Sequence, residues 1–349
     1  MVGPQGLEVE LDGGRRVRLD PQNPRSEGFA SVLAGLSDLR HPVYVELDPK
    51  TEAVSRLLVP KVGRIVAVRE RDDGIEVQVE KSHARMLLRR DREDFAELAA
   101  ILREAESTSG ILMLTPDDSQ SVEDLRFFRL GPDDGPIPDF PKYPEIGPRP
   151  FDFWRWPLWP WNWWRHRCVS MTRAQEIFDA MSATSCNPAG IAAPCIPFMY
   201  PDDGCWARAH EMRRLMNNLG VYPKKVWIHG SLATPTRNNP YCIVYWGWHV
   251  APTICVRLRW RWWYLFWWWW GERMVIDPSL FTTPVSKEQW KSVQGDPNAT
   301  LNEVSGDTYY WPNQTDPGYV DTNYYLNYYR IQLLNRVNNV GPPPYANCP

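Results

Sequence analysis

The chain has 349 residues, enough for about two domains of ordinary size. Hydrophobic residues make up 43% of it, so ordinary cores can form. The formal net charge is −3 and the sequence has no basic stripe of the kind that binds nucleic acid. No run of about 18 apolar residues predicts a membrane-spanning helix. The six histidines are scattered and no CxxC pair occurs, so we expect no metal site.

Residues 1–130 are predicted to form a small α+β accessory domain with a regulatory or targeting role. Alternating apolar residues on both sides of Asp72-Asp73-Gly74 predict a β-hairpin. Apolar residues at helical spacing predict a helix over 91–105. His41 and His83 are isolated in the sequence, so we expect both to be structural or exposed rather than functional.

A segment rich in proline and tryptophan, residues 131–165, is predicted to be an extended linker, because proline fixes φ and removes a backbone donor. It separates the accessory domain from a second unit, residues 166–349. Residues 1–150 hold 28 acidic and 21 basic residues, and the rest of the chain has an excess of basic residues. We therefore expect the acidic N-terminal domain to be able to cover a site in the second unit.

All seven cysteines lie in the second unit. If one of them is a reactive thiol, the other six can form three disulfides, and the sequence leaves their pairing open. Such a cysteine content favours an oxidising compartment and export from a bacterial cell, whereas the first residues show no apolar signal-peptide region. The location is therefore left open by the sequence.

The segment DDGCWARAHEMRRLMNNLG, residues 202–220, predicts an amphipathic helix that begins at Cys205. Asp202 and Asp203 are N-cap candidates and Gly204 permits a tight entry into the helix. A helix N-terminus favours a thiolate and would lower the pKa of Cys205. Its free N–H groups could also stabilise an oxyanion beside the sulfur.

Two apolar strands that follow carry the residues that a thiol nucleophile needs. His249 lies in CIVYWGWHVAPTICVRL, residues 242–258, and an imidazole is the natural base for a thiol. Asp277 ends the strand in MVIDPSLF and can hold the imidazole in one tautomer. Taken singly, each residue has an ordinary structural interpretation, a packed histidine or a turn aspartate, but their order predicts a Cys-His-Asp triad.

DDGCWARAHEMRRLM, WGWHVAP and VIDPSLFTTPVSKEQW together resemble the bacterial protein glutaminases, over roughly residues 172–335. The resemblance implies an α+β fold with a transglutaminase-like and papain-like core, in which the cysteine begins a helix packed on an antiparallel sheet that carries the histidine and the aspartate. It implies Cys205 as nucleophile, His249 as acid and base, and Asp277 as the residue that orients His249. The neighbouring residues Gly204, Trp206 and Trp248 are further candidates for oxyanion or substrate binding. A Trp-rich insertion before the Asp277 strand departs from the family pattern, and residues 1–150 do not resemble the family's prosegment.

The resemblance implies hydrolysis of glutamine side chains in proteins or peptides to glutamate, with release of ammonia through a thioester and without a cofactor. Transfer of the acyl group to an amine, as in transglutaminases, is an alternative that the sequence leaves open. A Trp-rich binding or membrane-interface module is another alternative, as is a deamidating effector or toxin.

Two tryptophan tracts, residues 151–164 and 260–270, have no counterpart in an ordinary core. We expect the second tract to form a hairpin arm whose aromatic side chains pack on the first tract or on the N-terminal domain. The alternative is an exposed aromatic surface over Trp260–Trp270 that contacts proteins or a membrane interface.

Overall fold

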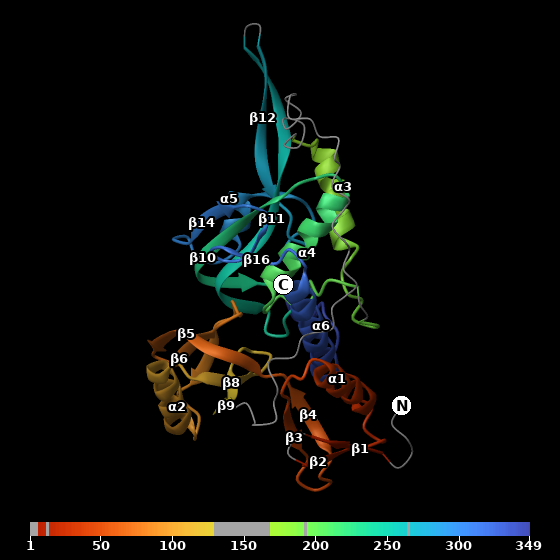
Figure 1. The fold of residues 1–349 in the computed structure, drawn as a ribbon, viewed down its shortest axis with the longest axis vertical. Helices are drawn as coiled ribbons and strands as arrows, with labels where there is room; N and C mark the ends of the chain where they lie inside the picture. The colour runs from red at the N-terminus through yellow and green to blue at the C-terminus, as the bar shows by residue number, and fades with distance from the viewer. Residues whose placement is uncertain (1–5, 12–13, 129–167, 192–193, 264–265) are drawn as a thin grey trace.

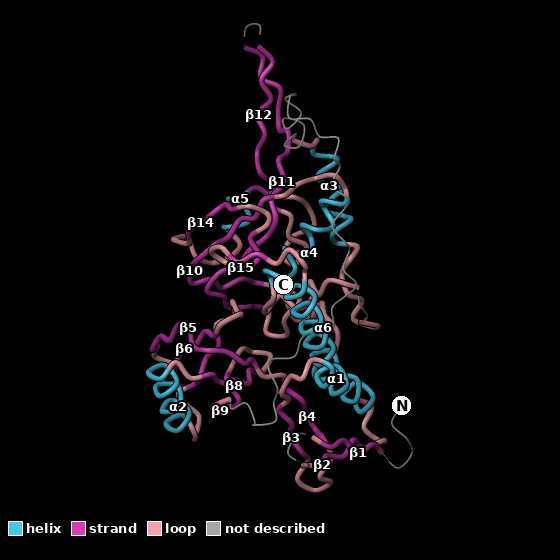
Figure 2. Tube along the Cα trace, in the orientation of Figure 1, coloured by secondary structure: helices cyan, strands magenta, loops and turns pink. Residues whose placement is uncertain are grey.

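The computed structural model describes residues 6–11, 14–128, 168–191, 194–263 and 266–349. These residues form a mixed α+β protein with two larger antiparallel sheets, as Figures 1 and 2 show. The α+β class predicted from the sequence is confirmed. The predicted linker, residues 131–165, and the first tryptophan tract lie outside the described residues.

One sheet organises the second half of the chain. Its strand order is β13-β12-β11-β10-β14 and every pairing is antiparallel. Alternation along β10 sends Val226 and Ile228 into a core on one face, while Trp227 joins a larger core on the other. Both faces are therefore covered. The strands are β10 Lys224–Pro235, β11 Ile243–Trp263, β12 Phe266–Val275, β13 Val285–Ser286 and β14 Thr300–Val304.

Helix α4, Cys205–Asn218, packs against this sheet, and its residues Ala209, Met212 and Met216 are buried as the periodicity predicts. Gly220, with φ of 78°, follows the helix end as expected of a C-terminal glycine. No helix among the described residues combines the length and apolarity needed to cross a membrane. The remaining elements of this half are α3 Met171–Ser182, α5 Lys287–Ser292, α6 Val320–Val340, β15 Thr308–Tyr310 and β16 Gln314–Thr315.

The side chain of Ser170 caps α3 by accepting a hydrogen bond from the backbone N–H of Arg173. The side-chain cap predicted for α4 is wrong. Helix α4 has Gly204 at its N-cap and no side-chain cap. The carboxylates of Asp202 and Asp203 are instead used in buried contacts with other parts of the chain.

The first part of the N-terminal half packs directly on the second half. Helix α1, which lies beside α6 in Figure 1, places Phe29 and Val32 in the same core cluster as α4 and α6. Two small hairpins flank α1. The elements here are β1 Leu7–Glu10, β2 Arg16–Leu19, α1 Ser26–Asp38, β3 Tyr44–Leu47 and β4 Val54–Leu58.

The rest of the N-terminal half forms a sheet of its own, in the order β7-β6-β5-β8-β9, with a separate core under α2. The predicted hairpin at Asp72–Asp73 is confirmed between β5 and β6, and the helix expected over 91–105 is α2, Phe95–Thr108. The strands are β5 Lys61–Arg71, β6 Gly74–Val79, β7 Met86–Arg89, β8 Ile111–Pro116 and β9 Val122–Phe127.

The second tryptophan tract forms the outer part of the β11–β12 hairpin, with register from Arg259↔Trp270 to Trp263↔Phe266. The predicted hairpin arm is confirmed. In Figure 1 the arm projects at the end of the molecule opposite the β5–β9 sheet, so the expected packing of this tract on the N-terminal domain is wrong. Its length carries it past the body of the protein.

Three disulfides join Cys168 to Cys255, Cys186 to Cys195 and Cys242 to Cys348. Cys205 is the free cysteine, as expected if six cysteines pair and one thiol is kept. The first and third disulfides each connect segments far apart in the sequence, at the base of the arm and at the C-terminus. Three such bonds fit a protein that folds in an oxidising compartment.

Candidate active site

The backbone before α4 brings Cys205 to the first residue of the helix. Gly204 has a φ of 81°, and a Cβ at this position would lie 2.2 Å from the Tyr329 ring. Only glycine meets both demands, the left-handed backbone and the close aromatic neighbour. The result is a thiol at a helix N-terminus that is 1% exposed.

Strand β11 carries His249 to the same place. Its Nε2 lies 2.9 Å from the Oδ2 of Asp277, just after β12, so Nε2–H donates to the carboxylate. Asp277 also accepts from the indole N–H of Trp290 at 2.9 Å and from the backbone N–H of Ser279 at 3.1 Å. The three residues predicted from the sequence thus come from α4, β11 and the end of β12.

Aromatic rings fix the plane of the His249 imidazole. Trp246 stacks on it with centroids 4.5 Å apart, and Trp290 lies 5.4 Å away at 28°. Burial lowers the pKa of His249, against the opposing effect of Asp277. Burial alone would raise the pKa of Asp277, but the imidazole and the hydrogen bonds from His249 and Trp290 hold it below its usual value. The pair is therefore a neutral imidazole beside a carboxylate at neutral pH.

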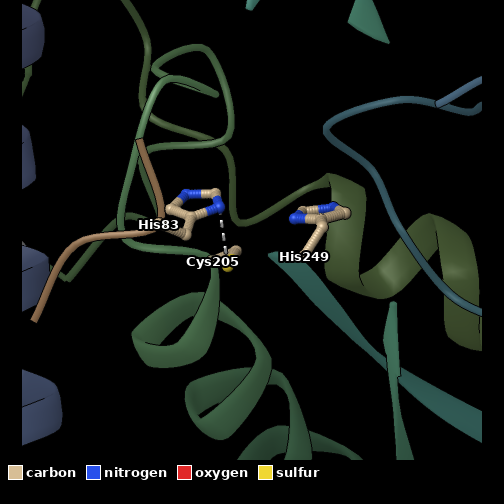
Figure 3. A group of neighbouring side chains, drawn as sticks. All are labelled: His83, Cys205 and His249. Atoms are coloured by element: carbon tan, nitrogen blue, oxygen red, sulfur yellow. Dashed lines mark hydrogen bonds between the residues drawn. The ribbon is translucent and has the colours of Figure 1, made fainter. Parts of the chain in front are cut away.

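A second histidine that the sequence did not indicate lies at the sulfur. Figure 3 shows Cys205 between His249 and His83, which comes from the loop between β6 and β7 in the N-terminal half. The Nδ1 of His83 is 3.4 Å from the sulfur, and ring nitrogens of both histidines and the sulfur all lie within 4.8 Å of one another. His83 is therefore not exposed: it is buried, hydrogen-bonded and in contact with the sulfur.

The segment that carries His83 is attached to the edge of the β11 strand. Ala84 forms an antiparallel bridge with Trp246, Gly247 N–H donates to His83 O, and Arg85 N–H donates to Tyr245 O, both at 2.9 Å. His83 Nδ1 also lies 2.9 Å from the carbonyl oxygen of Trp248. An extended peptide therefore lies along β11 with one side chain directed at the thiol.

Asp203, next to the helix start, holds this segment in place through its carboxylate. Its carboxylate accepts from the backbone N–H of His83 at 3.1 Å and from Ser82 Oγ at 2.5 Å, and it pairs with the ammonium of Lys61. All these groups are buried. Burial would raise the pKa of Asp203, but Lys61 and His83 keep it below its usual value. The residue before the N-cap thus ties the N-terminal half to the helix of Cys205.

Covered in this way, the thiol does not behave as the helix position alone suggests. Burial raises the pKa of Cys205 well above its usual value, although Arg208 and the backbone N–H of Val250 act in the opposite direction. The lowered pKa expected from the sequence is wrong for this closed arrangement, because loss of solvation outweighs the helix dipole.

The three further candidates are all close to the sulfur or to His249, and their contacts differ. The N–H of Gly204 donates to Asp203 Oδ1 at 2.9 Å. Trp206 is fully buried and its indole N–H donates to Tyr309. Trp248 is 9% exposed and its ring lies 4.9 Å from that of Trp227. Trp206 and Trp248 also contact each other, so they form part of the aromatic wall around the site.

Comparison with known proteins adds independent evidence. Residues 174–294 match a family model described as Glutaminase. A search of curated proteins finds no match. A variant of pro-protein-glutaminase and pro-protein-glutaminase itself have a similar fold, with TM-score 0.51 and 21% and 20% identity. The matches cover 82% and 84% of this chain and 95% and 99% of theirs.

The structure of protein-glutaminase from Chryseobacterium proteolyticum matches at 25% identity and TM-score 0.39, over 52% of this chain and 94% of its own. The coverage by the pro-forms exceeds what residues 166–349 can supply, so that likeness of fold reaches into the N-terminal half. The matched family region contains Cys205, His249 and Asp277. The family match over residues 174–294 and the fold shared with the pro-forms confirm the resemblance to the protein glutaminases that the sequence indicated, and they support an enzyme that deamidates glutamine.

Proposed function

We propose that this protein hydrolyses the side-chain amide of glutamine residues in other proteins, giving glutamate and ammonia. The observation that carries the proposal is the free thiol of Cys205 at the start of α4, beside the hydrogen-bonded pair of His249 and Asp277, in a region that matches the glutaminase family. The packing of α4 on an antiparallel sheet supports a transglutaminase-like or papain-like core.

In the first step, the sulfur of Cys205 attacks the carboxamide carbon of the substrate. Because Asp277 engages Nε2 of His249, Nδ1 is the nitrogen that takes the thiol proton and then gives it to the departing nitrogen. The C–N bond breaks, ammonia leaves, and a thioester remains on Cys205. Asp277 stabilises the imidazolium that forms between these events.

In the second step, water attacks the thioester carbon while His249 accepts its proton. The C–S bond then breaks, the thiolate is protonated again and the substrate carries glutamate. No cofactor takes part in this sequence. An amine in place of water would join two molecules by the same route, and the products distinguish the two outcomes.

We further propose that the N-terminal half holds the enzyme in a latent form. The segment from Ser82 to Arg85 occupies the edge of β11 and places His83 on the sulfur, where the substrate side chain has to enter. A substrate peptide that paired with β11 in the same way would present its glutamine to Cys205. The occupied edge and the buried thiol both support this reading.

The test is mass spectrometry of a glutamine-rich protein such as casein after incubation with the chain, both intact and after limited proteolysis in the proline-rich segment. We expect a mass increase of about one dalton at glutamine and release of ammonia after proteolysis, with much slower reaction beforehand. Cross-linked products would replace the proposal by acyl transfer to amines. Cleaved peptides, or reaction undiminished in Cys205→Ser, would contradict it.

A plain truncation at residue 150 is a poor version of this test. Phe29 and Val32 of α1 lie in the core cluster that includes α4 and α6, so their removal exposes apolar surface of the second half. Proteolysis of the folded chain leaves that core intact at the moment of cutting. It therefore separates release of the site from loss of the fold.

We propose that the β11–β12 arm contacts protein substrates or a membrane interface through the tract Trp260–Trp270. The arm extends the catalytic sheet and projects from the body of the protein in Figure 1. Tryptophan is favoured where an apolar surface meets water. The three disulfides support export of the protein to an oxidising compartment, where such contacts would be made.

A further inference from the structure

We infer that Cys205, His249 and His83 form a binding site for a divalent transition metal, with Zn²⁺ the best match, shared between the two halves of the chain. The three side chains are buried and their candidate ligand atoms lie within 4.8 Å of one another. No pattern in the sequence indicates such a site, because the residues come from three distant segments.

The spacing of one pair of ligand atoms suits tetrahedral coordination. Zinc binds thiolate sulfur at about 2.3 Å and imidazole nitrogen at about 2.0–2.1 Å, so two such ligands at a tetrahedral angle lie roughly 3.5 Å apart. The distance from Cys205 Sγ to His83 Nδ1 is 3.4 Å. The sulfur and this nitrogen are therefore already at the separation that a shared ion requires.

His249 offers the third ligand atom. Its Nδ1 is buried and has no hydrogen-bond partner among the described residues, whereas its Nε2–H is bound to Asp277. Histidines that ligate metals usually donate their other ring N–H to a carboxylate, which fixes the tautomer and leaves a lone pair for the ion. The Asp277–His249 pair has this arrangement.

His83 has a carboxylate behind it as well. Its Nε2 has no hydrogen-bond partner among the described residues and lies 3.4 Å from Asp203 Oδ1. With the ring proton on Nε2 and directed to Asp203, Nδ1 has a lone pair for the metal and exchanges its contact with the Trp248 carbonyl for the ion. Both histidines then face the ion with an aspartate on the opposite side.

One thiolate and two imidazoles favour zinc over magnesium or calcium, which prefer oxygen ligands. Binding displaces the proton of the Cys205 thiol to solvent, and the resulting bond is between the metal and the sulfur. The ion and its three ligands carry a net charge of +1, which the nearby carboxylates of Asp203 and Asp277 offset. Three protein ligands leave a fourth position for water.

The consequence for regulation rests on the proposed function. A metal held by His83 from the N-terminal half and by the two reactive residues blocks the nucleophile and fastens the covering segment in place. Binding of the metal itself does not depend on that activity, so it is measured without substrate.

The experiment is a titration of the full-length, metal-free chain with Co²⁺, whose absorption reports tetrahedral coordination and bonding to a thiolate, followed by competition with Zn²⁺. We expect saturation at a single equivalent with a thiolate-to-cobalt charge-transfer band, and loss of that band in Cys205→Ser. His83→Gln and His249→Gln should each weaken binding by at least about tenfold, the loss found even for residues behind the ligands.

His229→Gln is the matched control, because His229 is on the neighbouring strand β10 and outside the cluster. Near-ultraviolet circular dichroism verifies that each variant is folded. Unchanged affinity in folded His83→Gln would overturn the shared site, and the absence of a charge-transfer band in the wild-type chain would overturn the inference altogether. Neither result would bear on the proposed deamidase activity, which is measured separately after proteolysis.

Discussion

The thiol of Cys205 is kept neutral in this structure because it is buried between two imidazoles that are themselves uncharged. A helix N-terminus and a neighbouring base favour the thiolate only when solvent or substrate restores polarity around the sulfur. The thiol is therefore covered and neutral in this arrangement, and we expect its reactivity to depend on what replaces His83.

Substitutions in the proposed triad should separate the nucleophile from the residue that orients the base. In the proteolysed enzyme, Cys205→Ser should abolish ammonia release. Asp277→Asn keeps the shape of the side chain but favours the wrong His249 tautomer, so the turnover rate should fall by about 10³–10⁴-fold. Ammonia release from a glutamine peptide measures both, and wild-type turnover in Asp277→Asn would remove Asp277 from the triad.

His83→Ala in the full-length chain should make the sulfur more accessible. Loss of one contact to the thiol and of the ring that covers it should raise the rate of alkylation by iodoacetamide about tenfold, the scale of one buried hydrogen bond. Mass spectrometry of the Cys205 peptide gives the rate. His41→Ala is the control, since His41 is partly buried beside Pro60 and Tyr328, away from the sulfur; an equal rise in both variants would indicate general loosening instead.

Among single residues, the sequence predicted those that lie in a helical or strand pattern of apolar residues and missed those that do not. Cys205 begins an apolar helical repeat, His249 lies on a strongly apolar strand and Asp277 follows another, so each could be placed. His83 stands in a loop and meets Cys205 across 122 positions of the chain. Nothing within its own segment distinguishes it from His41.

At the scale of elements, the sequence pattern predicted α2, α4, the β5–β6 hairpin and the arm, whereas the cap expected for α4 was wrong. Asp202 and Asp203 fit the preference for acidic N-caps, yet both carboxylates are drawn into buried contacts, Asp202 with Arg336 at 2.6 Å and Asp203 with Lys61. Long-range ion pairs therefore override a local preference, and the sequence around a helix start does not reveal them.

The antiparallel register of the arm permits a test by shortening it. Replacing residues 258–270 with a short turn joins Arg257 to Gly271, which are already paired, and leaves the triad strands unchanged. We expect ammonia release from a short glutamine peptide to stay within about twofold, since no triad residue moves. Reaction with a large protein, or binding to anionic vesicles, should fall by tenfold or more if the tract supplies a few tryptophan contacts.

Both substrates are compared with the same proteolysed preparations, so that coverage of the site by the N-terminal half affects neither reaction rate. If the shortened variant keeps wild-type activity on both the peptide and the protein, and its vesicle binding is unchanged, the proposed role of the arm is wrong. A parallel loss on both substrates would mean that the arm supports the fold of the sheet.

Across the whole molecule, the predicted boundary between an accessory domain and a catalytic unit stays a prediction. The β5–β9 sheet has a core of its own, but α1 and its hairpins share a core with α4 and α6. Further contacts cross between the halves, among them Arg336 with Asp118 at 2.7 Å and Arg85 with the carbonyl of Leu232 at 2.8 Å. The excess of acidic residues near the N-terminus did not identify these individual pairs.

Lys61→Met should test how strongly the buried ion pair fastens the two halves. The variant leaves the carboxylate of Asp203 buried without its cation, which costs about 3–5 kcal/mol when one partner of such a pair is removed. Urea unfolding measures the loss, and hydrogen exchange around Ala84 shows whether the segment leaves β11. Lys50→Met, at an exposed position, is the control; an equal change in both variants would count against the role of the pair.

Stability should fall as the solution becomes acidic, even before carboxylates titrate. Burial lowers the pKa of His41 to about 4, of His83 to about 3 and of His210 to about 2. In the unfolded chain each histidine takes up a proton near pH 6.5, whereas the folded chain does not, so protons favour unfolding below that pH. Above about pH 7 these groups are neutral in both states and contribute no slope.

The measurement is the free energy of unfolding in urea between pH 8 and about pH 5.5, a range above the ordinary titration of aspartate and glutamate. We expect a plateau above pH 7 and a progressive decline below about 6.5. His83→Gln should show a shallower decline because one of the protons is no longer taken up on unfolding. A flat profile, or a rise in stability towards the acidic end of this range, would show that these histidines are not held neutral.

Because Ser82–Arg85 lies along β11 as part of the same chain, the fraction of molecules in which it occupies β11 does not depend on protein concentration. While the polypeptide is continuous, the attached peptide competes with incoming molecules at a fixed local concentration, in the millimolar range for short flexible connections. Diluting the protein does not relieve that competition. Once the connection is cut, rebinding becomes an encounter between separate molecules, and the same contacts weaken simply because the two pieces can diffuse apart.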